Sequence, residues 1–354
     1  MIRKVVFTGY SIGCLLGTLL FVSCNGLFMD SQKSNTPKNN FDLLWQIFDE
    51  RYCFFEEKQI DWDGVYEEYY GVLQQRTDNK THSEYQLFDL MSVMLLKLCD
   101  GHVVISNGTE SRTYTGWFSR YPENYDDALA GRYFNKSTES LNNGLSFTWL
   151  PGEIGYIRCS SFSDNINRNK LDDVLARFAS NKGVIIDVRG NGGGLVSEAY
   201  TLASHFVPEK TCVGYIRYKT GKGHGDFSEY FRRYVEPGGA TPFSGKVAIL
   251  TNRRVYSAAN LFVSVMKDLP QVCVIGAATG GGGGMPISAE LYNGWTVELS
   301  TNPMFDINKK SIESGIEPHR SVMLETRSKT SDNIIERAKE WILEESGSKS
   351  GGGV

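Results

Sequence analysis

Two segments in the second half of the chain share one pattern, which restricts the fold more than any other feature. Each starts with an apolar run typical of a buried strand, continues through a polar or Gly-rich loop, and then becomes an amphipathic helix. They span residues 182–207 and 246–269, and a further strand-like run follows each, at 212–220 and 271–279. Two consecutive strand–helix–strand units predict an α/β fold with a βαβ core and a mostly parallel sheet.

The regions around these units have a different periodicity. Residues 41–102 space apolar side chains as helices do, and we expect three helices that form a small helical N-terminal domain. Residues 103–150 are rich in Gly, Asn, Ser and Tyr, which is typical of an irregular connecting segment of short strands and loops. The α/β domain is then expected over 151–345, followed by a flexible, polar tail at 346–354.

The N-terminus has the pattern of a secretory signal. Arg3 and Lys4 precede an apolar stretch rich in small residues, and this stretch ends in a Val-Ser-Cys sequence at Cys24 that resembles a bacterial lipobox. We expect residues 1–23 to be a signal peptide, Cys24 to be the lipid attachment site, and polar residues 24–40 to be a tether. A membrane-spanning anchor is the alternative, but the apolar stretch is short for the roughly 20 residues that a span requires.

Composition excludes several classes of protein. The formal net charge is −4, and no basic stripe with interleaved aromatic residues occurs, so we expect no nucleic-acid partner. Hydrophobic residues make up 41% of the chain, enough for a core without a metal or disulfide framework. Beyond the signal and Cys24, five cysteines without CxxC spacing remain, each in an apolar context, and we expect them to be small buried residues: Cys53, Cys99, Cys159, Cys212 and Cys273.

In open α/β sheets, functional sites gather where strands end and helices begin. Two loops fall at such points, at 189–194 and 251–257. The first, RGNGGG, leaves backbone N–H groups uncovered, which suits a phosphate or a transient oxyanion. It lacks the dinucleotide fingerprint because Leu195 stands at the last glycine position, and the glycine run at 279–286 lacks the Lys and Ser/Thr of a P-loop. Flexible turns are the alternative interpretation for both loops.

Ser257 lies at the expected start of the second helix and allows two interpretations. It is either a helix N-cap or a nucleophile presented at a helix N-terminus. In the second case, the helix dipole and the N–H of Ala258 would favour the negative charge of an oxyanion.

A serine nucleophile needs a base, and His102 is the candidate among the five histidines. It follows a helical segment and an Asp-Gly turn and precedes a strand-like run, although a surface histidine in a turn would show the same pattern. His205 is expected to be structural. Glu313 and Glu317 are candidates for a carboxylate that orients the base, or are solvated surface charges.

Taken together, four motifs resemble the C-terminal-processing (tail-specific) serine peptidases, the group that includes the tricorn core protease. The motifs are GVIIDVRGNGGG, KVAILTNRRVYSAANLF, VIGAATGGGG and GIEP, in the family's order. The resemblance implies a crotonase/ClpP-like βαβ core with a helical N-terminal part, acyl transfer by a serine, and neither metal nor cofactor. It implies that Ser257 is the nucleophile and that Ala258, with Gly192 or Gly193, forms the oxyanion hole.

This sequence departs from the better known branch of the family, which uses a lysine base about 25 residues beyond the serine. Gly282 and its neighbours stand there instead. The tricorn-like branch uses an early histidine and a late glutamate, which implies His102 and Glu313. The family's Glu and Asp are replaced by Asn260 and His319. Only about 50 residues separate His102 from the segment IGYIRC, too few for the PDZ domain, of roughly 90 residues, that many relatives carry.

The sequence therefore favours a lipid-anchored serine endopeptidase that faces the periplasm or cell surface of a Gram-negative bacterium. Its partners would be a peptide or protein substrate and, through the lipid, a membrane. The alternatives are a binding protein on the same fold that has lost catalysis, and an esterase that uses the same residues.

Overall fold

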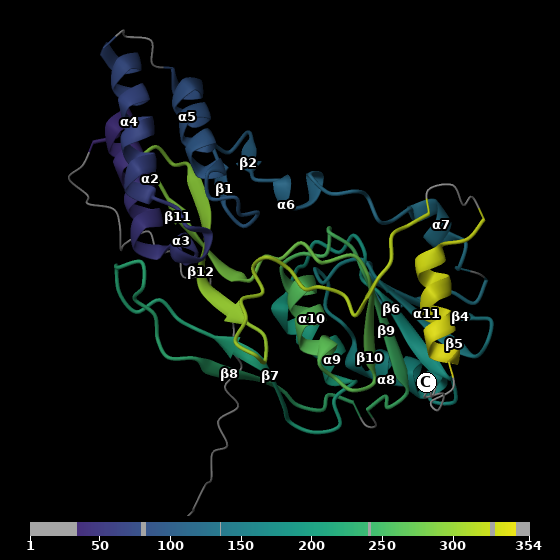
Figure 1. The fold of residues 1–354 in the computed structure, drawn as a ribbon. Helices are drawn as coiled ribbons and strands as arrows, with labels where there is room; N and C mark the ends of the chain where they lie inside the picture. The colour runs from purple at the N-terminus through teal and green to yellow at the C-terminus, as the bar shows by residue number, and fades with distance from the viewer. Residues whose placement is uncertain (1–33, 79–82, 135, 240–241, 326–329, 345–354) are drawn as a thin grey trace, which may run out of the picture.

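The computed structural model describes residues 34–78, 83–134, 136–239, 242–325 and 330–344 (Figure 1). The predicted signal peptide, Cys24, most of the predicted tether and the predicted tail lie outside these residues. Among the described helices, none has both the length and the apolar character that crossing a membrane requires.

Within the described residues, the N-terminal region contains four helices, whereas three were predicted over 41–102. They are α2 (Pro37–Arg51), the single-turn α3 (Phe55–Lys58), α4 (Trp62–Asp78) and α5 (Glu84–Leu96). Helix α2 starts inside the segment predicted to be a tether, and this boundary was wrong. The Thr36 side chain accepts a hydrogen bond from the N–H of Asn39 at 3.2 Å, and Pro37 occupies the first helical position, a strong start signal.

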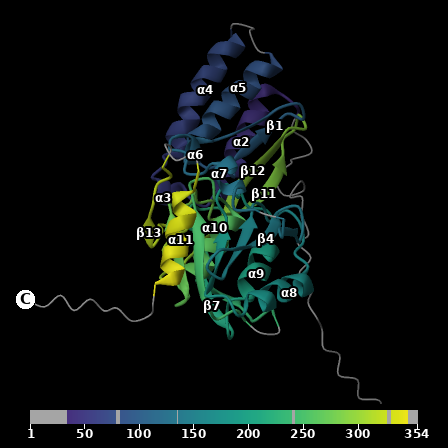
Figure 2. The ribbon, with the colours of Figure 1, turned by 90° about the vertical axis from the view of Figure 1, so that its right-hand side faces the viewer.

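These helices pack on a six-stranded, mainly antiparallel sheet, shown beside them in Figures 1 and 2. Its order is β2 (Ser111–Thr113), β1 (Val104–Ser106), β12 (Thr296–Phe305), β7 (Thr211–Ile216) and β8 (Phe231–Val235), with β11 (Gly284–Glu290) also paired to β12. Apolar residues of helices and strands share one core, in which Phe88 meets Trp295 edge to face at 5.2 Å. The helical region thus completes its core with strands from the last third of the chain.

The second sheet has seven strands and forms the α/β core. Its order is β13 (Arg320–Ser321), β10 (Val272–Gly276), β9 (Lys246–Thr251), β6 (Gly183–Asp187), β5 (Ile154–Cys159), β4 (Leu145–Leu150) and β3 (Glu139–Ser140). The strands from β13 to β5 are parallel, and β4 and β3 are antiparallel. This arrangement confirms the predicted mostly parallel α/β sheet.

Helices cover both faces of this sheet, as its alternating apolar side chains require. On β6, Val184 and Ile186 pack with α8 (Arg168–Phe178), α9 (Val196–Ser204) and α10 (Ala258–Lys267). Ile185, between them in sequence, points to the opposite face and packs with α11 (Asn333–Leu343). Figure 1 shows α11 across the sheet from α9 and α10.

One of the two predicted strand–helix–strand units is wrong. After β6 and α9, strand β7 leaves the parallel sheet and pairs antiparallel with β8 and β12 in the other sheet. Both neighbouring positions of β6 are already taken, by β5 and β9. The βαβ units are therefore β5–α8–β6 and β9–α10–β10, and only the second was predicted.

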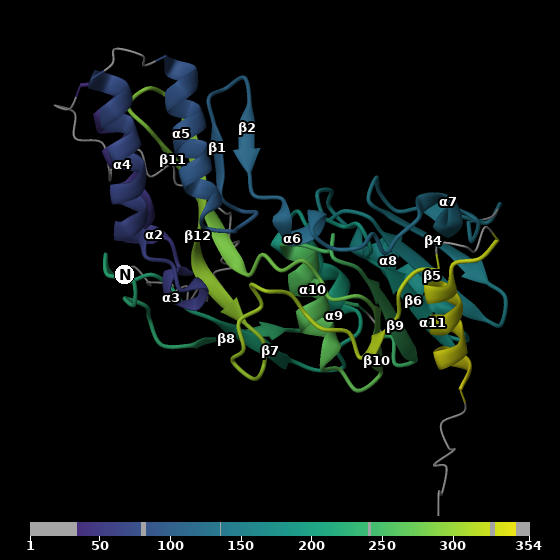
Figure 3. The same ribbon diagram turned by 45° about the horizontal axis from the view of Figure 1, so that its top comes forward.

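Residues 103–150 link the two sheets, as Figure 3 shows. They contain β1, β2, the short helices α6 (Gly116–Ser119) and α7 (Asp127–Gly131), β3 and β4. The predicted short strands are present, although β4 is a regular six-residue strand that pairs along its length with β5.

The five described cysteines are free thiols, and only two of them are buried as predicted, Cys159 and Cys273. Cys53 and Cys212 are partly buried, and Cys99 is exposed. Cys99 adopts a left-handed conformation (φ 49°) just beyond α5, so that the chain turns and its side chain faces outward. An apolar sequence context did not reveal this turn.

Candidate active site

Ser257 and His102 meet although 155 residues separate them. The distance from His102 Nε2 to Ser257 Oγ is 2.9 Å. Ser257 occupies the N-cap position of α10, but its side chain makes no capping hydrogen bond, so the N-cap interpretation is wrong. Its backbone has φ 55° and ψ −125°, a conformation that is costly for a residue with a Cβ. The strained turn directs the hydroxyl toward the imidazole instead of the helix.

The turn that carries His102 is built on a buried carboxylate. Asp100 Oδ1 accepts a hydrogen bond from the His102 N–H at 2.8 Å, which closes the tight turn at Gly101. The His102 ring lies against Tyr256, with 5.0 Å between ring centroids. Burial lowers the pKa of His102; Asp100 opposes this effect and Lys58 adds to it. The imidazole is therefore neutral at neutral pH, the form a base needs.

Asp100 organises this region, and the sequence analysis missed it. Its side chain is fully buried and accepts hydrogen bonds from Ser300 Oγ at 2.9 Å and the Tyr52 hydroxyl at 3.1 Å, besides the His102 amide. The Tyr256 hydroxyl donates a fourth, longer bond at 3.4 Å. These donors come from the residue that ends α2, from β12 and from the turn before α10, so a single carboxylate joins three distant segments. The only sequence signal was the Asp-Gly turn itself.

The predicted oxyanion donors are backbone N–H groups of the first turn of α10 and of the glycine loop that packs on it. The N–H of Ala258, in the first turn of α10, has no acceptor among the described residues. The N–H of Gly193 donates to the Asn191 side chain at 2.8 Å, whereas that of the exposed Gly192 has no acceptor in the described ranges. A Cβ at Gly193 would lie 2.8 Å from Ser257 Cβ, so this loop packs directly on the serine turn. Of the two predicted glycine N–H groups, that of Gly192 is the one without an acceptor in the described part of the chain.

The glycine run 280–284 is buried, so its interpretation as a flexible turn is wrong. The carbonyl of Gly281 accepts from the Ser257 N–H at 2.9 Å, and the N–H of Gly282 donates to the Glu313 carbonyl at 3.2 Å. Gly282 has φ 81°, and a Cβ there would lie 2.7 Å from the Tyr256 ring. The position of the family's lysine therefore has no room for a side chain here.

Glu313 lies on the far side of this glycine run. Its carboxylate pairs with Lys58 Nζ at 2.8 Å and accepts the Gly283 N–H at 2.8 Å. Burial, reinforced by Asp100, raises the pKa of Glu313 to about 8, although Lys58 and the Gly283 amide partly offset the shift. Among the described residues, Nδ1 of His102 is buried without a hydrogen-bond partner, so Glu313 does not contact the ring directly. Glu317 is exposed.

The two positions that depart from the family's pattern have structural contacts. Asn260 accepts a hydrogen bond from Thr279 Oγ1 at 2.6 Å and donates one to the Ile312 carbonyl at 2.9 Å, which fastens α10 to the segment that carries Glu313. His319 Nδ1 accepts the Val274 N–H at 3.0 Å. His205 is buried and its Nδ1 lies 2.8 Å from the Thr201 carbonyl, in agreement with the structural role predicted for it.

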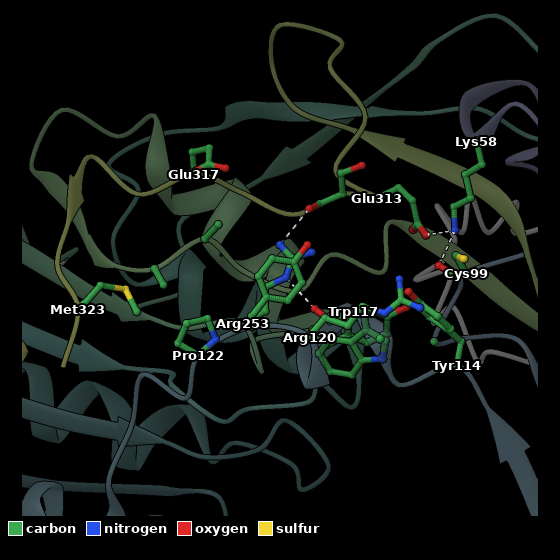
Figure 4. A pocket seen from close by; sticks show the side chains of 18 residues that line it. Lys58, Cys99, Tyr114, Trp117, Arg120, Pro122, Arg253, Glu313, Glu317 and Met323 are labelled. Carbon is green, nitrogen blue, oxygen red and sulfur yellow. Dashed lines mark hydrogen bonds and ion pairs between the residues drawn. The ribbon is translucent and has the colours of Figure 1, made fainter. Parts of the chain in front are cut away.

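A cavity of about 550 Å³ adjoins the pair and is shown in Figure 4. Gly101 and Tyr256, the neighbours of His102 and Ser257, form part of its wall, and Trp117 stacks on Tyr256 with 4.1 Å between ring centroids. Glu313 and Lys58 lie at one end of the cavity and Met323 at the other. Within the described ranges, no group of three or more His, Cys, Asp or Glu side chains is arranged to hold a metal ion.

Family models match two parts of the chain: peptidase family S41 matches residues 153–322, and the tricorn protease C1 domain matches residues 34–95. The crystal structure of a candidate peptidase from Parabacteroides merdae is 40% identical, with a TM-score of 0.82, and the match covers 88% of this chain and 98% of that one. The photosystem II D1 C-terminal processing protease shares the fold, with 16% identity, a TM-score of 0.52 and coverage of 82% and 94%.

Among curated proteins, the carboxy-terminal processing protease CtpA of Bacillus subtilis is 29% identical over 168 residues. That match covers 47% of this chain and 34% of the relative, so the chain spans about a third of the length of such relatives. The family model covers the part of the α/β core from β5 to β13, and the match to the Parabacteroides structure covers 88% of this chain and 98% of that one. On these grounds, the chain belongs to peptidase family S41, a family of serine-type peptidases.

Proposed function

We propose that this protein is a serine endopeptidase that cleaves peptide bonds through an acyl-enzyme, with Ser257 as nucleophile and His102 as base. The observation that carries this proposal is the 2.9 Å contact between His102 Nε2 and Ser257 Oγ. That distance is within hydrogen-bond reach, as proton transfer requires. The lowered pKa of His102 keeps its Nε2 able to accept a proton at neutral pH.

In the first half of the reaction, Ser257 Oγ attacks the peptide carbonyl carbon while its proton passes to His102 Nε2. The N–H groups of Ala258 and Gly192 hold the carbonyl oxygen as it becomes negative. The C–N bond then breaks, and the departing amine takes the proton from His102. In the second half, water attacks the acyl carbon and gives a proton to His102. The bond from the acyl carbon to Ser257 Oγ then breaks, His102 returns the proton to Oγ, and the carboxylic acid product leaves.

We propose that Glu313 supports the imidazolium by its charge without direct contact. The carboxylate lies across the glycine run from Ser257 and is paired with Lys58. Glu313 would favour the protonated ring that forms during the reaction when it is ionised, which its raised pKa of about 8 restricts to the alkaline range.

We propose that the substrate is a peptide or protein, and that the cavity beside Tyr256 receives side chains next to the scissile bond. An aromatic wall and a few polar groups are typical of such pockets. The chain from His102 to β5 is occupied by the short elements β1 to β4, α6 and α7, which leave no room for a PDZ domain. We therefore propose internal cleavage and do not assume selection of a C-terminus.

We further propose that the protein is exported and anchored by a lipid on Cys24, facing the periplasm or cell surface. The sequence pattern at residues 1–24 is the support for this proposal.

A fluorophosphonate probe and a peptide library test the proposal. The wild type should be labelled at Ser257 and should hydrolyse peptides, whereas Ser257→Ala and His102→Ala should lose both activities. His224→Ala is the matched control, since His224 is partly exposed and pairs with Asp49 at 2.7 Å, away from Ser257. Folded wild type that binds peptides without labelling or hydrolysis would support the binding protein instead, and turnover of esters alone would support an esterase.

A further inference from the structure

Lys58 reaches the active site from the N-terminal helices. It is the last residue of the single-turn helix α3, and its side chain is only 17% exposed. Its ammonium donates to Glu313 Oε1 at 2.8 Å and to the carbonyls of Leu98 and Cys99 at 3.2 Å each, and lies 3.8 Å from Asp100 Oδ2. Figure 4 shows Lys58 beside Glu313 at the end of the cavity.

We infer that Lys58 is a positioning residue of the active site, which holds the turn that carries His102 against the segment that carries Glu313. This inference rests on the proposed function. The N-terminal helical region then contributes to the active site, because Lys58, which joins the His102 turn to the Glu313 segment, belongs to α3.

The first argument is geometric. Leu98 and Cys99 directly precede the Asp100-Gly101-His102 turn, and their carbonyls lie just beyond the end of α5, where helical carbonyls lose their partners. Lys58 donates to both carbonyls and thereby fixes the start of the turn. Without it, two carbonyls would lose a charge-assisted donor only three to four residues before the base.

The second argument concerns charge. Asp100 and Glu313 are both buried, and in the described part of the chain Lys58 is the only cationic side chain within 4.0 Å of either carboxylate. Removing one partner of a buried ion pair leaves an uncompensated charge and costs far more than the pair contributes. Lys58 is thus the cation nearest to Asp100, and its contact with Glu313 opposes the rise in the pKa of that carboxyl.

The third argument excludes a role as base. An ammonium has three N–H donors, and those of Lys58 are taken by Glu313, Leu98 and Cys99. Although burial alone would lower the pKa of Lys58, Glu313 and Asp100 more than offset this effect and raise it. Lys58 is therefore a permanent cation and does not replace the lysine base absent at Gly282.

The test compares Lys58→Met and Lys58→Arg with Lys222→Met. Lys222 pairs with Glu50 of α2 at 2.8 Å, so it also joins a distant loop to the N-terminal helices, but it does not contact the active site. We expect Lys58→Met to lower kcat for peptide cleavage by about tenfold to a hundredfold with KM changed less than threefold. Lys58→Arg should retain more activity than Lys58→Met, and Lys222→Met should match the wild type. Equal kcat in folded Lys58→Met and wild type would overturn the inference.

The pKa of His102, followed by NMR of the histidine rings, gives a readout that does not need turnover. Asp100 raises and Lys58 lowers this pKa, and the uncharged Tyr256 and Ser257 face the ring. Removing the cation should raise it in Lys58→Met and leave it unchanged in Lys222→Met. A similar His102 pKa in the wild type, Lys58→Met and Lys222→Met would contradict the inference. An inactive wild type would defeat the proposed function, but this pKa comparison would still test the role of Lys58.

If Lys58→Met does not fold, the double variant Lys58→Met, Glu313→Gln decides. At a pH above the pKa of Glu313, where that carboxylate is ionised, the double variant removes both charges of the pair, so it should be more stable than Lys58→Met alone. A double variant no more stable than the single one would show that Lys58 is not the counter-ion of Glu313.

Discussion

Gly282 packs closely against the turn that carries the nucleophile, and a single methyl group there provides a sharp test of the structure. Gly282 has φ 81°, and an added Cβ would lie 2.7 Å from the Tyr256 ring and 3.0 Å from the Ser257 nitrogen. Gly294 is the matched control, because it has nearly the same φ, 82°, and nothing within 4 Å of an added Cβ. A left-handed conformation costs a non-glycine residue about 1–2 kcal/mol, and overpacking costs a further 1–3 kcal/mol or so.

We therefore expect Gly294→Ala to lower the free energy of unfolding by about 1–2 kcal/mol, and Gly282→Ala by about 2–5 kcal/mol. Urea unfolding measures both values. The probe should also label Gly282→Ala more slowly than Gly294→Ala, because the crowded atoms belong to Ser257 and its neighbour. Equal destabilisation and equal labelling in the two variants would refute the packing described around Ser257. Gly282→Lys should likewise fail to restore activity to His102→Ala.

Three further predictions concern the surroundings of the site. Asp100→Asn should lose about 2–4 kcal/mol of stability and most peptidase activity, since an amide cannot accept from four donors. A free energy of unfolding in urea and a kcat that both equal the wild-type values would contradict this prediction. The pKa of Glu313 is raised to about 8 in the folded state, so its protonation stabilises the folded state. This stabilisation is complete below pH 4.5, the ordinary pKa of the group, and is lost as the pH rises toward 8. Glu313→Gln should therefore lose less stability than the wild type between pH 5 and 8, with a difference of at most about 5 kcal/mol, and parallel pH curves would argue against it. Trp117→Ala should raise KM about five- to tenfold with little change in kcat, because it removes part of the cavity wall; a pure kcat effect in peptide kinetics would be the contrary result.

The sequence was informative where chemistry depends on local pattern. The strand, loop and helix around Ser257 follow from apolar periodicity and small residues, and the parallel sheet follows from their repetition. His102 was a candidate base for Ser257 from its place in an Asp-Gly turn, and the family resemblance supported the pair, but no periodicity relates residues 155 positions apart.

What the sequence missed depends on long-range contacts. Strand β7 has the composition of a parallel core strand, but both positions beside β6 are occupied, by β5 and β9. The local sequence of β7 does not show which strand pairs with β6. Asp100 and Lys58 look like ordinary surface charges, and their importance comes from the distant segments they join. The buried glycine run resembled a flexible turn because burial is a property of the neighbours that pack on it.

The most direct test of the account is to trap the acyl-enzyme. Mass spectrometry after rapid acid quench, during turnover of an activated peptide ester, should show the acyl mass on the peptide that contains Ser257. The same experiment with His102→Ala should show little or no acylation on the same timescale. Continued peptide hydrolysis with no mass increase on Ser257, or equal acylation without the imidazole, would contradict the central claim that His102 activates Ser257 as a nucleophile.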